Sequence, residues 1–188
     1  MIIWITGLLG CGKSTLFYKI HSELGTGRKI IKDRIPFFVY EKKSPTNIMS
    51  VDIAMLGRTN RKRVLNGNDG IMCAKSVFMK FIDDEYPKHH HMIIEGNKFA
   101  KTDVFHHLRQ YNLKVIHLKA PMELIRDRSI KSDTGTNKKW TLKKWSNQMK
   151  RYEMLLNTTE MNDHVLVRDS VIEKDLDNIC NEVMALLI

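Results

Sequence analysis

The hydrophobic and polar positions of the chain predict short buried strands that alternate with amphipathic helices. Apolar, β-branched runs, which are typical of buried strands, occupy Met1–Thr6, Lys29–Lys32, Val51–Leu56, Met92–Ile94, Val115–Leu118 and Val165–Val167. Apolar residues at helical spacing follow Gly12 and recur at Ile71–Phe81, at Thr102–Tyr111, after Pro121, at Leu142–Leu156 and at Asp169–Ile188. Such alternation predicts right-handed βαβ units. We therefore expect a three-layer α/β fold with a mostly parallel sheet and helices on both faces.

The segments between these elements are predicted to be loops. They are rich in Lys, Ser, Asn, Gly or Pro and comprise Glu41–Asn47, Gly57–Gly70 and Lys131–Lys139. The chain has 188 residues and shows neither an internal repeat nor a linker. A single domain over residues 1–188 is therefore expected.

Composition narrows the class of protein. No apolar run approaches the ~20 residues that cross a bilayer, so we expect no membrane association. The first residues lack the charged and apolar regions of a secretory signal, so we expect a cytoplasmic protein. Cys11, Cys73 and Cys180 lie far apart and lack the spacing of a zinc site, which favours reduced thiols.

The charge is positive and unevenly distributed. The chain holds 31 Lys and Arg against 21 Asp and Glu, a formal net charge of +10. The segment 126–151 alone carries nine Lys and Arg against two Asp. Such a concentration favours a polyanionic partner, and we expect a nucleic-acid substrate to contact it, although the same charge also serves solubility.

One motif points directly to chemistry. A complete P-loop motif, G-x-x-x-x-G-K-[ST], is present at Gly7-Leu8-Leu9-Gly10-Cys11-Gly12-Lys13-Ser14-Thr15. Gly7, Gly10 and Gly12 let the backbone curl so that its N–H groups, with those of Cys11 and Thr15, face phosphate oxygens. Lys13 is expected to reach the β- and γ-phosphates of ATP, and the Ser14 hydroxyl to bind Mg²⁺. A glycine-rich turn without a ligand is the alternative.

The motif itself does not distinguish a kinase from a GTPase or an ATPase. The Asn-Lys-x-Asp run with which GTPases bind their base is absent from the sequence, and a helicase would need a longer chain. A small kinase needs an acceptor pocket, a base and a cationic lid. Asp33 and Glu95 each follow a predicted strand, where open α/β sheets bind ligands. Asp33 is the first candidate for the base, and Glu95 is a candidate for holding Mg²⁺ through water or for orienting the acceptor. Arg126 and Arg128 lead into a predicted lid at about 126–140.

Each of these candidates also has a structural interpretation. Asp33 lies between two basic residues and is equally typical of a solvated turn. Glu95 follows a buried strand directly, and a role in packing is the alternative there. Arg126 and Arg128 would also complement the negative C-terminal end of their helix.

The P-loop, the Glu95-Gly96 pair and the paired arginines resemble the nucleoside and nucleotide kinases among P-loop proteins. A closer resemblance is to the bacteriophage P-loop kinases that phosphorylate 5-hydroxymethylpyrimidine bases in DNA. It spans roughly residues 3–150 and rests on four further blocks, in the family's order: Leu56-Gly57-Arg58-Thr59, Gly67-Asn68-Asp69, Glu95-Gly96-Asn97-Lys98 and Leu142-Lys143-Lys144-Trp145. Asn97 stands where the family has Asp, while Gly70 and Trp145 stand where it has Arg.

This resemblance implies a P-loop kinase fold with a small basic lid and makes Asp69 a second candidate for the base. It implies an ATP- and Mg²⁺-dependent kinase that acts in DNA hypermodification, in the host cytoplasm if a phage encodes it. A base within a duplex would have to flip out to reach the γ-phosphate. Two alternatives remain open: a kinase of free nucleosides, nucleoside monophosphates or another small metabolite, and a nucleic-acid-stimulated NTPase.

Overall fold

The computed structural model describes residues 1–43, 50–57, 71–131, 146–147, 149–150 and 163–187. Its strands are β1 (Ile2–Gly7), β2 (Arg28–Lys32), β3 (Ile35–Lys43), β4 (Ser50–Leu56), β5 (His91–Glu95), β6 (Leu113–Lys119) and β7 (Val165–Asp169). Its longer helices are α1 (Lys13–Leu24), α2 (Lys75–Glu85), α3 (Thr102–Leu108), α4 (Met122–Lys131) and α6 (Glu173–Leu186). Short 3₁₀ helices follow α2 at Tyr86–Lys88 and α3 at Arg109–Tyr111.

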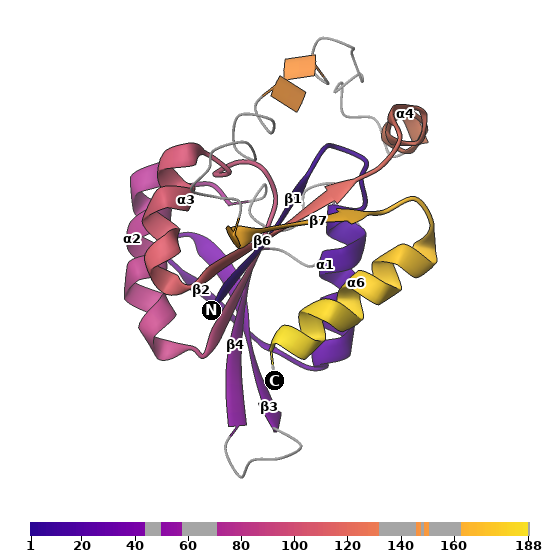
Figure 1. The fold of residues 1–188 in the computed structure, drawn as a ribbon. Helices are drawn as coiled ribbons and strands as arrows, with labels where there is room; N and C mark the ends of the chain where they lie inside the picture. Colours follow the sequence, from indigo (N-terminus) through magenta and orange to yellow (C-terminus); the bar gives the residue numbers. More distant parts are fainter. Residues whose placement is uncertain (44–49, 58–70, 132–145, 148, 151–162, 188) are drawn as a thin grey trace.

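The seven strands form one sheet in the order β2-β3-β4-β5-β1-β6-β7 (Figure 1). The strands β4, β5, β1, β6 and β7 are parallel, whereas β3 pairs antiparallel with both β2 and β4. The prediction of an α/β fold with a mostly parallel sheet is confirmed. The strand that leads into the P-loop, β1, is central, with β5 and β6 as its neighbours.

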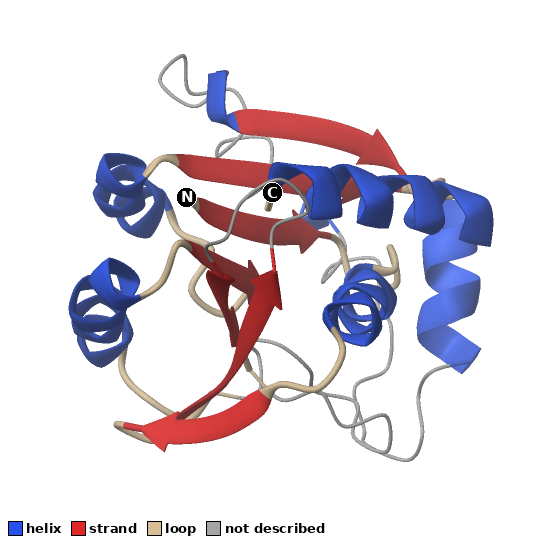
Figure 2. Cartoon of the chain, turned by 90° about the horizontal axis from the view of Figure 1, so that it is seen from below, coloured by secondary structure: helices blue, strands red, loops and turns tan. Residues whose placement is uncertain are grey.

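Helices cover both faces of the sheet, as predicted (Figure 2). Alternate residues of β1 divide between two apolar clusters: Ile2 and Trp4 pack with residues of α2 and α3, and Ile3 and Ile5 pack with residues of α1 and α6. A strand buried on both faces needs apolar residues at every position, which explains the uninterrupted N-terminal run.

The antiparallel edge of the sheet departs from the prediction. Residues Glu41–Lys43, predicted as part of a loop, belong to β3, and the run from Ile35 was not predicted as a strand. Lys32 pairs with Ile35, so β2 and β3 form a hairpin with a two-residue turn. Both turn residues, Asp33 and Arg34, have positive φ, as in a type I′ turn. Arginine is rare in that conformation, so the sequence contains no usual turn signal.

Several element boundaries also differ. The helix expected from Ile71 begins at Lys75, and of the helix expected over Thr102–Tyr111 only Thr102–Leu108 is α-helical. Asp169 is the last residue of β7, where it pairs with Lys119, so α6 begins only at Glu173. Most of the predicted helix 142–156 and of the lid lies outside the described residues. Within the described ranges, no helix is long and apolar enough to cross a bilayer.

Candidate nucleotide-binding site

The P-loop joins the end of β1 to the start of α1, which is the strand–loop–helix context expected of the motif. Gly7 (φ +140°) and Gly12 (φ +92°) adopt conformations that L residues rarely adopt. A Cβ at Gly7 would lie 2.6 Å from both Cys11 Sγ and the Leu118 carbonyl oxygen. The glycines at the two ends of the loop are therefore required by its geometry. Gly12 is the N-cap of α1, and its carbonyl accepts the first helical hydrogen bond, from Leu16 N–H at 2.9 Å.

Lys13 is held at the loop by a backbone carbonyl. Its side chain is buried, and its Nζ donates to the Leu8 carbonyl at 2.9 Å. The same carbonyl accepts the Cys11 N–H at 3.3 Å. Lys13 therefore has a local partner that a phosphate group can replace without leaving the Leu8 carbonyl unsatisfied.

Glu95 and Ser14 lie together beside the loop. In the sheet register Ile5 of β1 pairs with Glu95, which ends β5 and is fully buried. The Ser14 hydroxyl donates to Glu95 Oε1 at 3.5 Å. A hydroxyl and a carboxylate are oxygen ligands of the kind that Mg²⁺ prefers, so these two residues fit a magnesium ion at the mouth of the loop. The structure thus places Glu95 where a functional role is chemically reasonable.

The two predicted arginines occupy different positions on α4. Arg128 is half-buried and donates from Nη1 to the Ser170 carbonyl at 2.9 Å and from Nη2 to the Val171 carbonyl at 2.7 Å. Arg126 is exposed. Since Ser170 also contacts the P-loop, with its hydroxyl 2.6 Å from the Cys11 carbonyl, Arg128 connects α4 to the P-loop.

Asp33 does not join this group. It is exposed in the turn between β2 and β3, and the strands β3, β4 and β5 separate β2 from β1. Strand β2 runs in the same direction as β1, because β2 and β4 both pair antiparallel with β3, and β4, β5 and β1 are parallel. The expected position of Asp33 beside the ligand crevice is wrong because β2 lies at the edge of the sheet and not next to β1. Asp69, the second candidate for the base, lies outside the described residues.

Three polar residues near the loop were missed as candidate site residues. Asn97 donates from Nδ2 to the Gly7 carbonyl at 2.9 Å, and Ser170 contacts Cys11. Under the loop, the buried ring of His117 lies 3.1 Å through Nδ1 from Thr6 Oγ1. Burial, with the positive charges of Lys119 and Lys13, lowers the pKa of His117 to about 4, so the ring is neutral at pH 7. Asn97 lies in the block Glu95-Gly96-Asn97-Lys98, whereas no motif marks Ser170 or His117 in the sequence.

The three thiols are free, as the sequence predicted. Burial raises the pKa of Cys11 despite the opposing charge of Lys13, and burial also raises the pKa of Cys180, to about 11. These two thiols are therefore protonated at neutral pH, and Cys11 fills space in the P-loop rather than acting as a nucleophile.

Comparison with known proteins adds little to this geometry. No protein-family model and no curated protein sequence matches the chain. Among solved structures, a gluconokinase from Sinorhizobium meliloti 1021 is similar at 12% identity and a TM-score of 0.43, over 98% of this chain and 95% of that chain. A similarity this low carries no argument about function. The functional conclusion therefore rests on the P-loop and the groups that surround it.

Proposed function

We propose that this protein is an ATP- and Mg²⁺-dependent kinase that transfers the γ-phosphate to a hydroxyl group of a nucleotide-type acceptor. One observation carries the proposal: a complete P-loop, after the central one of the five parallel strands, with a buried carboxylate next to its Ser14 hydroxyl. In an open α/β sheet this position is the crevice at which ligands bind.

We assign the following roles to the residues of the site. The N–H groups of the loop and Lys13 bind the β- and γ-phosphates. Ser14 and Glu95 would hold a magnesium ion, which would neutralise charge on the phosphate oxygens. The acceptor hydroxyl attacks the γ-phosphorus, ADP departs, and the hydroxyl proton passes to a carboxylate, for which Asp69 is the candidate that remains. Arg126, which is exposed on α4, stabilises the charge on the transferred phosphoryl group.

The acceptor that we favour is a 5-hydroxymethylpyrimidine base in DNA. Two sequence features support it: the basic segment 126–151, and the resemblance of the short blocks to phage DNA-base kinases. A kinase of free nucleotides has no need of such a concentration of positive charge outside its pocket. Flipped or single-stranded substrate is required because a stacked base cannot reach the γ-phosphate.

The test is transfer of label from γ-labelled ATP to a panel of acceptors. The panel contains hydroxymethylated DNA in single- and double-stranded form, unmodified DNA, nucleosides and nucleoside monophosphates, with a Lys13→Ala variant as the inactive control. Label on hydroxymethylated DNA alone is the expected result. Label on a small acceptor would instead identify a metabolite kinase, and phosphate released to water on addition of any DNA would identify a nucleic-acid-stimulated NTPase.

A further inference from the structure

The carbonyl groups of the P-loop are held by side chains from distant parts of the chain. The Gly7 carbonyl accepts from Asn97 Nδ2 at 2.9 Å, and the Cys11 carbonyl accepts from Ser170 Oγ at 2.6 Å. A trans peptide is planar, so its carbonyl and its N–H point in opposite directions. Fixing the Cys11 carbonyl therefore also fixes the direction of the Gly12 N–H, one of the groups that the motif supplies to phosphate.

Ser170 is placed firmly enough to serve this purpose. It directly follows β7 and is fully buried. Its N–H donates to the Lys119 carbonyl at 2.7 Å, and its hydroxyl also lies 3.0 Å from that carbonyl. Because the Lys119 carbonyl already accepts the N–H, the shorter contact to Cys11 is the principal use of the hydroxyl proton.

Arg128 holds the next part of the same turn. Its two terminal nitrogens donate to the adjacent carbonyls of Ser170 and Val171, at 2.9 and 2.7 Å. A planar guanidinium that binds two acceptors fixes both distance and orientation, which a lysine ammonium does not. The contacts thus run without interruption from α4 through Arg128 and Ser170 to the P-loop, on the side of the molecule where α4 and the β7–α6 connection lie (Figure 1).

We infer that Ser170 is a positioning residue for nucleotide binding, and that Arg128 acts on the P-loop through it. This inference rests on the proposed function, because it assumes that the loop binds phosphate. It differs from the role expected of Arg128 from sequence, which was direct contact with the transferred phosphate. In the structure the Arg128 guanidinium fixes the backbone at Ser170 and Val171, and Ser170 in turn fixes the P-loop. Replacing Arg128 should therefore weaken nucleotide binding and not only slow the chemical step.

The experiment measures the dissociation constant of Mg·ADP by calorimetry, with Tm from thermal unfolding alongside. Ser170→Ala is expected to weaken binding ~5- to 30-fold, the effect of losing one buried hydrogen bond. The control is Tyr40→Phe, which removes another buried hydroxyl, on β3 and bonded to His21 rather than to the loop. It is expected to lower Tm by a similar amount while Mg·ADP binds as to the wild type. An equal loss of affinity in both variants would overturn the inference.

Arg128 provides a test that does not depend on a buried substitution. Arg128→Gln and Arg128→Lys are both expected to weaken Mg·ADP binding several-fold, whereas Arg28→Gln, on the exposed outer strand β2, is expected to bind normally. Rescue by lysine would show that only the charge matters and would overturn the inference. Combining Arg128→Gln with Ser170→Ala is expected to add little to Ser170→Ala alone, since one residue acts through the other, and full additivity would contradict this.

Failure of the proposed function would look different. A wild-type protein that binds neither Mg·ADP nor Mg·ATP would reject the P-loop as a nucleotide site and the inference with it. A wild-type protein that binds normally, with Ser170→Ala and Arg128→Gln binding equally well, would reject the inference alone.

Discussion

Lys13 has the largest predicted effect of any single residue, and its removal should leave the fold intact. Its Nζ donates to the Leu8 carbonyl, which keeps the Cys11 N–H when the lysine is absent. Lys13→Ala is expected to lower phosphoryl transfer ~10³-fold or more, because a charge that faces the transition state is removed. The measurement is the rate of transfer from γ-labelled ATP together with Tm. Near-normal turnover in a folded variant would remove the P-loop from the mechanism.

Glu95 is predicted to act on magnesium and not on stability alone. Glu95→Gln keeps the shape of this buried side chain but removes the charge beside Ser14. We expect a ~10²-fold or greater loss of rate and a higher Mg²⁺ concentration at half-maximal rate. Glu85→Gln is the matched control, since Glu85 is also buried but lies at the end of α2. An unchanged magnesium dependence in Glu95→Gln would assign Glu95 to packing.

The first glycine of the motif is predicted to be required for shape. Gly7→Ala would place Cβ 2.6 Å from the Leu118 carbonyl, a backbone atom that cannot move aside cheaply. Gly25 also has positive φ, +82°, but nothing lies within 4 Å of its Cβ position. Both variants bear backbone strain of ~1–3 kcal/mol, and only Gly7→Ala adds a clash. Urea unfolding should therefore show a larger loss of stability for Gly7→Ala, together with loss of nucleotide binding, and equal losses would contradict the steric argument.

Among single residues, the sequence identifies those that belong to a motif with fixed spacing. The P-loop residues were found because one local pattern specifies them all. Ser170 was not found because it lies 159 positions from Cys11, and a single serine after a strand carries no signal. Asp33 was misplaced because its position was inferred from the end of a strand whose place in the order of the sheet the sequence does not reveal.

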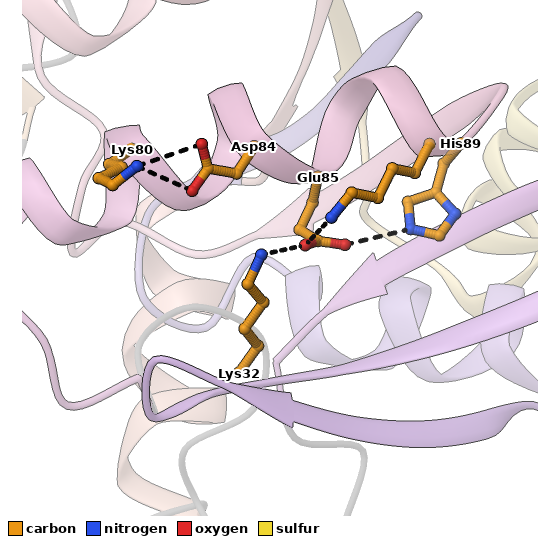
Figure 3. A network of polar contacts seen from close by, with 6 residues as sticks. Lys32, Lys80, Asp84, Glu85 and His89 are labelled. Atoms are coloured by element: carbon orange, nitrogen blue, oxygen red, sulfur yellow. Dashed lines mark hydrogen bonds and ion pairs between the residues drawn. The ribbon is translucent and has the colours of Figure 1, made fainter.

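At the scale of elements, an ion cluster fastens the β2–β3 hairpin to α2. Glu85 is buried at the end of α2 and accepts from Lys32 Nζ at 2.5 Å and from Lys88 Nζ at 2.7 Å (Figure 3). Burial raises the pKa of Glu85, but the two lysines outweigh it, so the pKa lies below its ordinary value. The carboxylate is therefore charged at neutral pH, and removing one lysine leaves a buried charge less compensated.

Lys32→Met is expected to destabilise the protein, because it leaves the buried Glu85 carboxylate with one cationic partner fewer. The control is Lys80→Met, because the pair Lys80–Asp84 lies on the same helix but is exposed, and such pairs contribute only ~0.3–0.5 kcal/mol (Figure 3). Since the pKa of folded Glu85 is depressed, its contribution is present above the unfolded-state pKa and is lost as pH falls through the folded-state value. The measurement is urea unfolding of wild type and Lys32→Met at pH 7 and at a pH below about 4. The difference in the free energy of unfolding between the two proteins should be smaller in acid. A difference that does not depend on pH would contradict this role of Glu85.

The hairpin also shows which elements sequence patterns miss. The parallel strands were predicted because burial on both faces produces continuous apolar runs. Strand β3 contains Phe37 and Tyr40 in the core but ends in Glu41-Lys42-Lys43, which favoured a loop over its last residues. What stabilises those residues as a strand is pairing with Ser50–Asp52 of β4, a tertiary interaction that overrides local preference.

At the scale of the whole molecule, the alternation of strands and helices was enough to predict the layers but not the order of the strands. The position of β1 between β5 and β6 depends on which way each crossover returns to the sheet. That order decides the site, because it brings Glu95 next to the P-loop and leaves Asp33 at the far edge. The motif therefore predicts the ligand from the sequence alone. Which other residues lie around the motif can be known only from the order of the strands in the sheet.

The last prediction concerns the distribution of charge and decides between a polymeric and a small acceptor. Lys138, Lys139, Lys143 and Lys144 lie outside the described residues, within the basic segment 126–151. If the acceptor is a base in DNA, these lysines bind the phosphodiester backbone. Replacing all four by Gln should then weaken DNA binding and flatten its salt dependence by ~0.7–0.9 log unit for each phosphate that is no longer neutralised. Turnover at saturating DNA should change little, because these interactions are equally strong in the ground state and the transition state.

The control is a variant with the same change of charge at four exposed lysines elsewhere, Lys29, Lys80, Lys101 and Lys174. Its net charge falls equally, so a general electrostatic attraction would flatten the salt dependence of both variants to the same extent. A localised interaction with the DNA backbone would affect only the variant in the basic segment. Wild-type slopes in that variant would contradict a polymeric substrate. Since the P-loop and Glu95 are untouched in both variants, transfer to a nucleoside or monophosphate would then be the activity to measure.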